Sequence, residues 1–431
     1  MVDLNRVDWQ RSNKHHPIFM RFQVLAGVVA ALASVVLLTE PVCAEGHGKA
    51  TARGPSSKSD GTDFTTEARD MFRVAACGSD EAIAARFAKT AKQTIDNHCE
   101  RMGRIYSWYR VSWMDKAKPF IAKLRPADAP TTVVYPFGGG DLSSALTVFP
   151  DATELTTISL EAAGDIRTID TIGTDRLKDD LSTTAKSISR LYNAAHSTTQ
   201  NLMVASHAEL PGTIMFALAG LAVHDMVPLQ LRYFELEADG SIRYLTTDEM
   251  DAREAEIVAS RKAKHSKHFW YEQTSAFANV EITFRPRGDE KATPRVYRHI
   301  LANLDNAHLT ADKRLLEHLR AKGNVSVMTK AASFLLWWDD FSQIRDHLLK
   351  TTAWMISDAS GIPPRYADKA GFEQTTFGDF TGPYFIQDPI NARAEFVKLW
   401  ADQPHRDLPF RFGYPDKEKH NHLLVTRPKT R

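Results

Sequence analysis

Residues 131–161 read TTVVYPFGGGDLSSALTVFPDATELTTISLE, and this stretch decides the fold class. Its first part, residues 131–137, is a β-branched and aromatic run typical of a buried strand. Three glycines follow at 138–140 and indicate a sharp turn of the backbone. Asp141 then stands where the N-cap of a helix belongs, before the largely apolar residues 142–149. The sequence therefore predicts a strand, a tight turn and a helix in direct succession.

A second strand is expected over residues 155–160, ending at Glu161. A helix that joins two strands over so few residues predicts a right-handed βαβ unit of a parallel sheet. In such proteins, ligands bind at the carboxyl ends of the strands, beside the turns that lead from each strand into the next helix. We therefore expect an α/β fold with a Rossmann-like, mostly parallel sheet flanked by helices. An N-terminal helical layer and late antiparallel strands complete it.

Length and composition are those of an ordinary globular protein. The chain has 431 residues, of which 43% are hydrophobic and 25% are charged, so it can bury a large core in one domain or two. With a formal net charge of +1, the chain lacks the strong positive electrostatic potential that is typical of nucleic-acid-binding proteins. We expect no nucleic-acid partner, and an unidentified small molecule is the partner that a carboxyl-edge site suggests.

The N-terminus carries the pattern of a secretory signal. A basic flank at residues 20–23 precedes an unbroken apolar run at residues 24–38, and the sequence VCA follows at residues 42–44. This pattern predicts export with cleavage after Ala44, and a true start at Met20. We expect a periplasmic or secreted protein without stable membrane insertion. The alternative is an uncleaved anchor, for which the run is shorter than the ~20 residues that span a bilayer.

The chain divides into four parts by composition and pattern. We expect a signal peptide at 1–44, a disordered spacer rich in Gly, Ser, Lys and Thr at 45–66, a helical layer at 67–130 and the Rossmann-like domain, with hairpin insertions, at 131–431.

Removal of the signal leaves two cysteines, Cys77 and Cys99. Two cysteines in an exported protein favour a disulfide. One straight helix over residues 79–110 would instead separate them by about 30 Å, at ~1.5 Å per residue. The pairing therefore requires a break in that helix, and the sequence leaves both outcomes open.

The remaining elements follow from periodicity and turn signals. Helices are expected at residues 176–195, 215–223, 248–264, 311–322, 339–357 and 391–401. Strands are expected at residues 228–237, 241–245, 279–286, 295–304, 324–330, 372–380 and 422–427.

Gly138, Gly139, Gly140, Asp141 and Glu161 form the first candidate ligand-binding group. Backbone N–H groups of a glycine turn can hold a phosphate, and an acid at the end of the next strand can bind ribose hydroxyls. Two features oppose this interpretation. The G-x-G-x-x-G pattern is absent, and a capping carboxylate occupies the N–H groups and repels an anion. The alternative is a turn that only reverses the chain.

Lys330, Arg345 and Asp358 form the second candidate group. Lys330 ends an expected strand, so it can meet Asp141 and Glu161 at the carboxyl edge and bind an anionic ligand there. Asp141, Lys330 and Asp358 are the candidate catalytic residues, as acids or bases. The alternatives are an ion pair that ties the glycine turn to the later helix, and for Asp358 an ordinary turn after a helix.

Metal and nucleophile patterns are weak. His265 and His268, with Glu272, have helical spacing but lie in a basic run that opposes a cation. His420 and His422 alternate as on a strand near the end of the chain. We expect no metal site, and no G-x-S-x-G motif is present.

The strand, glycine loop, helix and acidic end of the second strand resemble the first motif of class I methyltransferases over about thirty residues. The resemblance departs at residues 135–137, YPF, where those enzymes usually carry an acid before the glycines. It implies a Rossmann-like fold more than S-adenosylmethionine binding. We expect no cofactor, with S-adenosylmethionine as the alternative.

A second resemblance runs from Val133 to the C-terminus and is to an uncharacterised family of exported bacterial proteins. Its motifs are YPFGGGD (135–141), KAASFLL (330–336), SDASGIPPR (357–365), FGDFTGPY (377–384) and LPFRFGY (408–414). This resemblance implies a shared fold and no particular mechanism.

These observations lead to two functional hypotheses. The first is an accessory or small-ligand-binding envelope protein that kept the fold and lost cofactor chemistry. The second is an enzyme, either a methyltransferase-like transferase or a hydrolase, acting at the crevice formed by residues 138–141, Glu161 and Lys330.

Overall fold

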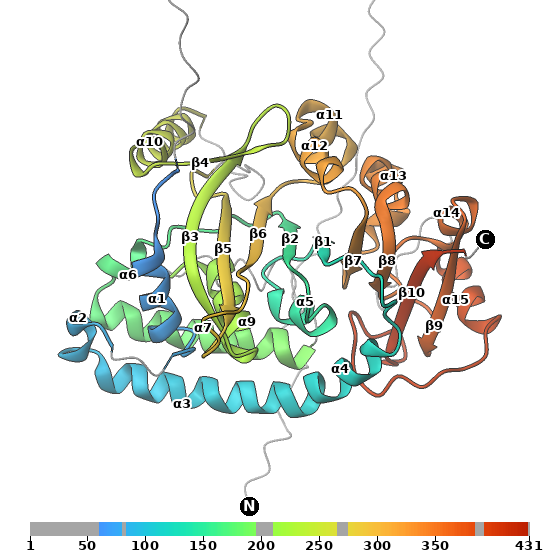
Figure 1. Cartoon of the computed structure of the whole chain (residues 1–431), viewed down its shortest axis with the longest axis horizontal. Coiled ribbons are helices and arrows are strands. Elements are labelled where there is room, and N and C mark those ends of the chain that lie inside the picture. The colour runs from blue at the N-terminus through green and yellow to red at the C-terminus, as the bar shows by residue number, and fades with distance from the viewer. Residues whose placement is uncertain (1–59, 80–82, 195–209, 265–274, 384–391, 430–431) are drawn as a thin grey trace, which may run out of the picture. The chain divides into compact units, whose positions relative to one another are not determined.

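A ten-stranded sheet organises the protein (Figure 1). The computed structural model describes residues 60–79, 83–194, 210–264, 275–383 and 392–429, so the expected signal peptide lies outside the described residues. The strand order is β4-β3-β5-β6-β2-β1-β7-β8-β10-β9. The strands are β1 (Thr132–Pro136), β2 (Glu154–Ser159), β3 (Met226–Leu236), β4 (Ile242–Tyr244), β5 (Asn279–Pro286), β6 (Arg295–Leu301), β7 (Val325–Thr329), β8 (Thr352–Ser357), β9 (Phe372–Gly378) and β10 (His422–Pro428).

The centre of the sheet is parallel and its flanks are antiparallel. Strands β6, β2, β1, β7 and β8 pair in parallel, whereas β3, β4 and β5 on one side and β9 and β10 on the other pair antiparallel. The expected α/β class is confirmed, but a mostly parallel sheet is not, because the hairpins enlarge both flanks. When β3–β5 are set aside, the other seven strands, numbered along the chain, lie in the order 3-2-1-4-5-7-6.

Helices cover both faces of the sheet (Figure 1). One face packs against α1 (Thr65–Val74), α3 (Lys92–Tyr109), α4 (Asp115–Ala122), α5 (Leu142–Val148), α7 (Thr174–Ala194) and α9 (Gly212–Val223). The other packs against α11 (Asn306–Ala311), α12 (Arg314–Ala321), α13 (Ser342–Thr351) and α14 (Pro364–Lys369). The remaining helices are α2 (Ala85–Ala88), α6 (Thr168–Thr171), α10 (Thr247–Lys264), α15 (Ala392–Ala401), the π-helix η1 (Arg110–Met114) and the 3₁₀ turns η3 (Leu335–Trp337) and η4 (Asp339–Phe341).

Successive side chains of β8 enter the hydrophobic core on opposite faces of the sheet. Trp354 and Ile356 belong to the core on one face, and Met355 between them belongs to the core on the other. Successive side chains of a strand point to opposite faces, so a strand covered on both sides is apolar throughout. This apolar run is also why the sequence prediction failed here. It extended the helix from 339 to 357, whereas α13 ends at Thr351 and the central strand β8 begins at Thr352.

The N-terminal boundary also differs from the expected one. The spacer was expected to reach residue 66, but the Phe64 N–H donates to the Leu231 carbonyl at 2.8 Å and α1 starts at Thr65. Phe64 is 3% exposed and stacks edge-on against Tyr233, with ring centroids 5.4 Å apart. The segment from Thr62 onward therefore belongs to the folded domain.

Cys77 and Cys99 form a disulfide, with the sulfur atoms 2.05 Å apart. The continuous helix over residues 79–110 that would keep the cysteines apart does not form, since α2 ends at Ala88 and α3 is a separate helix. Cys77 lies in the turn after α1, and α3 starts only at Lys92. The break brings the two Cα atoms within 5.3 Å and decides the question that the sequence left open.

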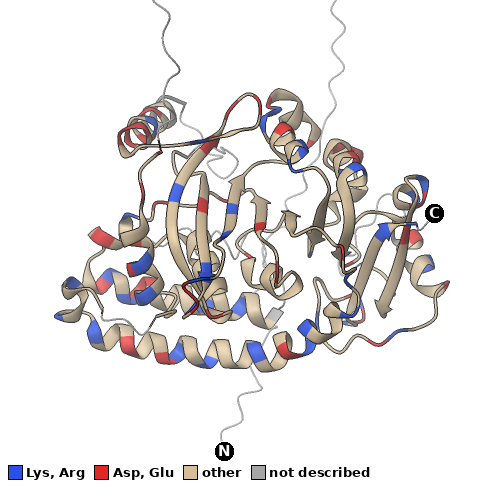
Figure 2. Cartoon of the chain, viewed as in Figure 1, with Lys and Arg blue, Asp and Glu red and all other residues tan. Residues whose placement is uncertain are grey.

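Charges are mixed along the surface helices rather than separated by sign. Figure 2 shows acidic and basic residues interspersed along α3. Among the described residues, no helix combines the length and apolar character that crossing a bilayer requires.

Candidate functional site

The strand order reverses between β1 and β7, and ligands of open α/β sheets lie at such a reversal. The structure brings Asp141, after β1, and Lys330, after β7, together at this point. The Lys330 Nζ lies 2.5 Å from the Asp141 Oδ2, and both side chains are almost completely buried, 2% and 3% exposed. The two expected carboxyl-edge charges therefore face each other rather than an open crevice.

The Asp141 carboxylate is also satisfied by its own helix. Its Oδ1 accepts from the backbone N–H of Ser144 at 3.3 Å, which is the expected N-cap of α5, and from the Ser143 hydroxyl at 3.2 Å. Its Oδ2 accepts from the Tyr135 hydroxyl at 3.3 Å. Lys330 donates a further hydrogen bond to the Ser144 hydroxyl at 2.6 Å. The group is a buried hydrogen-bonded network built around one ion pair.

Part of the backbone of the glycine turn is hydrogen-bonded within the fold. The Gly138 N–H lies 3.0 Å from the Ile158 carbonyl of β2, and the Asp141 N–H donates to the Gly138 carbonyl at 3.1 Å. Gly139 has a left-handed φ of 52°, and a Cβ at Gly140 would lie 2.6 Å from the Cβ of Phe216. The glycines are explained by the turn and by the close approach of α9.

Aromatic side chains of the N-terminal layer close the space above the ion pair. The Trp113 ring of η1 lies 5.9 Å from the Lys330 Nζ, within cation–π range. Tyr109 stacks on Trp113 with centroids 5.3 Å apart and on Tyr192 with centroids 3.9 Å apart. Burial raises the pKa of the Tyr109 phenol well above its usual value, and the nearby Asp141 charge raises it further. This phenol stays protonated and acts as a neutral hydrogen-bonding group.

A C-terminal segment, residues 408–414, completes the closure. The Trp113 indole N–H donates to the Arg411 carbonyl at 2.6 Å, and Phe410 packs edge-on against the same ring. The Tyr414 N–H donates to the Asp358 Oδ2 at 2.9 Å. Among the described residues, these side chains pack around the Asp141–Lys330 pair, at the point where the strand order predicts a crevice.

Asp358 follows β8 and is 1% exposed. Besides the Tyr414 bond, its carboxylate accepts the backbone N–H groups of Ala331 at 3.0 Å and Ser360 at 2.9 Å, together with the Ser360 hydroxyl. A Cβ on Gly413 would lie 2.0 Å from its Oδ2. This carboxylate joins three loops at the carboxyl edge, an arrangement that favours the structural alternative over an acid–base role.

Glu161 lies at the end of β2 beside His299, which sequence reasoning missed. The His299 Nε2–H donates to the Glu161 carbonyl at 2.7 Å, and the Thr157 hydroxyl lies 3.3 Å from Nδ1. Burial lowers the pKa of His299 to about 4, although hydrogen bonds to the backbone of Glu161 and Gly139 act in the opposite direction. A neutral histidine therefore links β6 to the end of β2 and the glycine turn. The sequence held no signal for it beyond its place in an expected strand.

Arg345 contacts a different part of the protein. Its guanidinium donates to the carbonyl oxygens of Leu336 and Trp338, both at 3.0 Å, and stacks on Tyr366 at 3.8 Å. These contacts hold the turns after β7 against α13. None of them includes Asp141 or Lys330, so the structure does not bring Arg345 into contact with the carboxyl-edge network.

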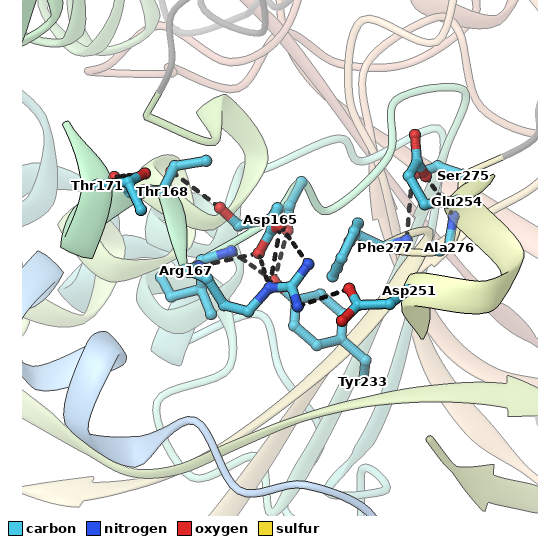
Figure 3. Close-up of polar contacts among 12 residues, drawn as sticks. Asp165, Arg167, Thr168, Thr171, Tyr233, Asp251, Glu254, Ser275, Ala276 and Phe277 are labelled. Atoms are coloured by element: carbon cyan, nitrogen blue, oxygen red, sulfur yellow. Dashed lines mark hydrogen bonds and ion pairs between the residues drawn. The ribbon is translucent and has the colours of Figure 1, made fainter. Parts of the chain in front are cut away.

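The loop after β2 is fastened to its surroundings by Arg167 (Figure 3). The Arg167 guanidinium pairs with Asp165 at 2.8 Å and with Asp251 of α10 at 2.8 Å, and it covers the Phe277 ring at 4.8 Å. The Tyr233 hydroxyl donates to the Gly164 carbonyl at 2.5 Å. These contacts hold the loop against β3, α10 and the turn that precedes β5.

The part of the chain that the structure describes contains no group of three metal-ligating side chains in suitable geometry. His265, His268 and Glu272 lie outside the described residues. His420 pairs with Asp416 at 3.0 Å, and His422 is buried among Phe380 and Trp400.

The fold and the site define an α/β protein with a mixed ten-stranded sheet whose strand-order reversal holds a buried Asp–Lys pair. No protein-family model matches the chain, and neither a curated protein nor a solved structure matches it.

Proposed function

We propose that this is an exported accessory protein of the cell envelope, built on a Rossmann-like domain whose original ligand crevice is closed. The observation that carries the proposal is the buried Asp141–Lys330 pair at the strand-order reversal. Anionic cofactors need unpaired cations or backbone N–H groups at this point. Here the lysine is neutralised, and Asp141 takes the Ser144 N–H at the first turn of α5.

The proposal predicts that the domain binds no nucleotide-type cofactor. Thermal unfolding with S-adenosylhomocysteine, nucleotides and sugar acids at millimolar concentration should leave the melting temperature unchanged, since only a ligand that binds the folded state raises it. A saturable rise that is lost in Asp141→Asn and kept in Asp402→Asn, an exposed control carboxylate, would overturn it.

One observation favours an enzyme as the second candidate. Four non-glycine residues with left-handed φ values flank the ion pair, namely Phe137 at 62°, Ala331 at 53°, Ser333 at 49° and Phe334 at 57°. Such backbone strain gathers at functional sites. In this alternative Lys330 and Ser144 act on a methyl-donor or ester substrate after the aromatic cover opens. The thermal-unfolding series with the same ligands also tests this alternative, which predicts binding that is lost in Asp141→Asn.

The export proposal rests on the signal pattern at residues 20–44 and is supported by the Cys77–Cys99 disulfide, since disulfides persist in oxidising compartments. In a Cys43→Ser background, a thiol-alkylating reagent added before cell lysis should leave Cys77 and Cys99 unmodified, because the disulfide protects both. A chain that starts at residue 45 is the cytosolic control and should be alkylated at both positions. Equal alkylation of the two chains would contradict export.

The same pair should stabilise the purified protein. The disulfide closes a loop of 22 residues and so lowers the entropy of the unfolded chain. This loss of entropy raises the free energy of the unfolded state by about 3 kcal/mol. Reduction, or the double variant Cys77→Ser/Cys99→Ser, is expected to lower the free energy of unfolding in urea by that amount.

A further inference from the structure

A deep cavity lies away from the Asp141–Lys330 pair, at the ends of β3 and β6. Its volume is about 560 Å³, and its walls come from β3, β6, α10, α11 and α12. Strands β3 and β6 both run antiparallel to β5, so their carboxyl ends lie at one edge of the sheet. Cavities of this size hold small organic ligands, and this edge is where α/β proteins place them.

The inner wall of the cavity is apolar. Phe234, Ile300, Leu309 and Leu315 line it and are between 1% and 6% exposed. A ligand that enters the cavity therefore places its larger part against hydrocarbon, and burial of that part drives binding.

Two arginines at the rim of the cavity are each paired with a carboxylate. On the α10 side, the Arg253 guanidinium lies 2.5 Å from the Glu235 carboxylate. On the α12 side, the Arg314 guanidinium pairs with Asp312 through contacts of 2.5 to 3.0 Å and donates to the Leu236 carbonyl. Each arginine at the rim already has a carboxylate partner, so a phosphate or carboxylate ligand would have to displace an acid.

Hydrogen bonds hold the side chain of Asn279, a polar residue of the cavity wall, in place. The Asn279 side chain donates to the Phe234 carbonyl at 3.2 Å and accepts from the Leu301 N–H at 2.9 Å. Helix α10 is tied to the loop after β2 by the Arg167–Asp251 pair (Figure 3). The cavity walls are thus braced from both sides, which reduces the entropy lost on binding.

We infer that this cavity is a binding site for an uncharged amphipathic small molecule, with its apolar part against Phe234, Ile300 and Leu315 and its polar end at the Arg253 and Arg314 rim. This inference goes beyond the proposed accessory role, because it assigns a class of ligand and a binding site that is separate from the closed crevice at the strand-order reversal.

Two fluorescent probes of similar aromatic shape and different charge test the inference. N-phenyl-1-naphthylamine is uncharged, and 1-anilinonaphthalene-8-sulfonate is an anion. We expect the uncharged probe to bind saturably with one site per chain and the anion to bind at least tenfold more weakly. In Ala311→Trp, which fills the cavity from an exposed lining position of α11, binding should fall at least tenfold.

Ala307→Trp is the matched control, because Ala307 is exposed on the same helix but does not line the cavity. Binding by this variant should equal that of the unmodified chain. Tighter binding of the anion, or equal loss in both tryptophan variants, would overturn the inference, as would absence of probe binding. In the nucleotide series, loss of the effect in Asp141→Asn reports on the strand-order reversal, whereas the tryptophan variants report on the cavity, so the failure of either proposal is recognised separately.

Discussion

Lys330→Met should lower the free energy of unfolding by about 3–5 kcal/mol, because it leaves the Asp141 carboxylate buried without its partner. Asp141 is 3% exposed, and its remaining hydrogen-bond donors are neutral. Removal of one member of a buried pair leaves a charge in a medium that solvates it poorly. Urea denaturation of the folded domain at pH 7 measures the change.

Lys398→Met is the matched control for this loss. Lys398 is likewise paired with a carboxylate, that of Asp402 at 2.6 Å, but its side chain is 74% exposed. Exposed pairs contribute less than about 1 kcal/mol. The double variant Asp141→Asn/Lys330→Met removes both charges and should recover most of the lost stability. Equal losses in Lys330→Met and Lys398→Met would show that the pair at the strand-order reversal is not desolvated.

Acidification from pH 6.5 to pH 4 should destabilise the protein through its buried histidines. Burial lowers the pKa of His299, His318 and His347 to about 4 in each case, whereas an unfolded histidine titrates near 6.5. Between these values the unfolded chain binds more protons than the folded one, so stability is complete above pH 6.5 and falls with decreasing pH. The loss attributable to His299 alone is about 3 kcal/mol at pH 4.

His299→Gln isolates this contribution, because the glutamine amide can donate to the Glu161 carbonyl and does not titrate. We expect the variant to lose less stability than the unmodified chain between pH 6.5 and pH 4. His405→Gln is a control for which we expect the opposite effect on the pH dependence of stability. His405 is exposed, and its hydrogen bond to Asp407 raises its pKa, so it favours the folded state at low pH. Identical pH profiles for His299→Gln and the unmodified chain would contradict the assignment.

The central βαβ unit was predictable because its signals are local. A β-branched run, three glycines and a capping aspartate fall within residues 131–149, and β1, the turn and α5 form there with boundaries shifted by one residue. The antiparallel hairpins were predictable for the same reason. β3 and β4 flank an Ala-Asp-Gly turn and β5 pairs with β6, and both pairs belong to the hairpin insertions that the sequence predicts.

β8 could not be separated from α13 in the same way. Residues 353–356 of β8 are apolar on both faces because each face is covered, so the strand lacks the alternation that marks a half-buried strand. The sequence also placed Asp141, Glu161 and Lys330 at one edge without showing which would meet. The structure joins Asp141 to Lys330 and places His299 against Glu161.

The sequence by itself determined the α/β class, the glycine turn and the capped helix, because these depend on the conformational preferences of neighbouring residues. Only the tertiary structure decided whether the turn leaves room for a ligand. Trp113, Phe410 and Tyr414 come from segments some three hundred residues apart, and they close the strand-order reversal together. Whether a carboxylate and a lysine bind a ligand or each other depends on the distance between them and on access to water, and chain folding sets both.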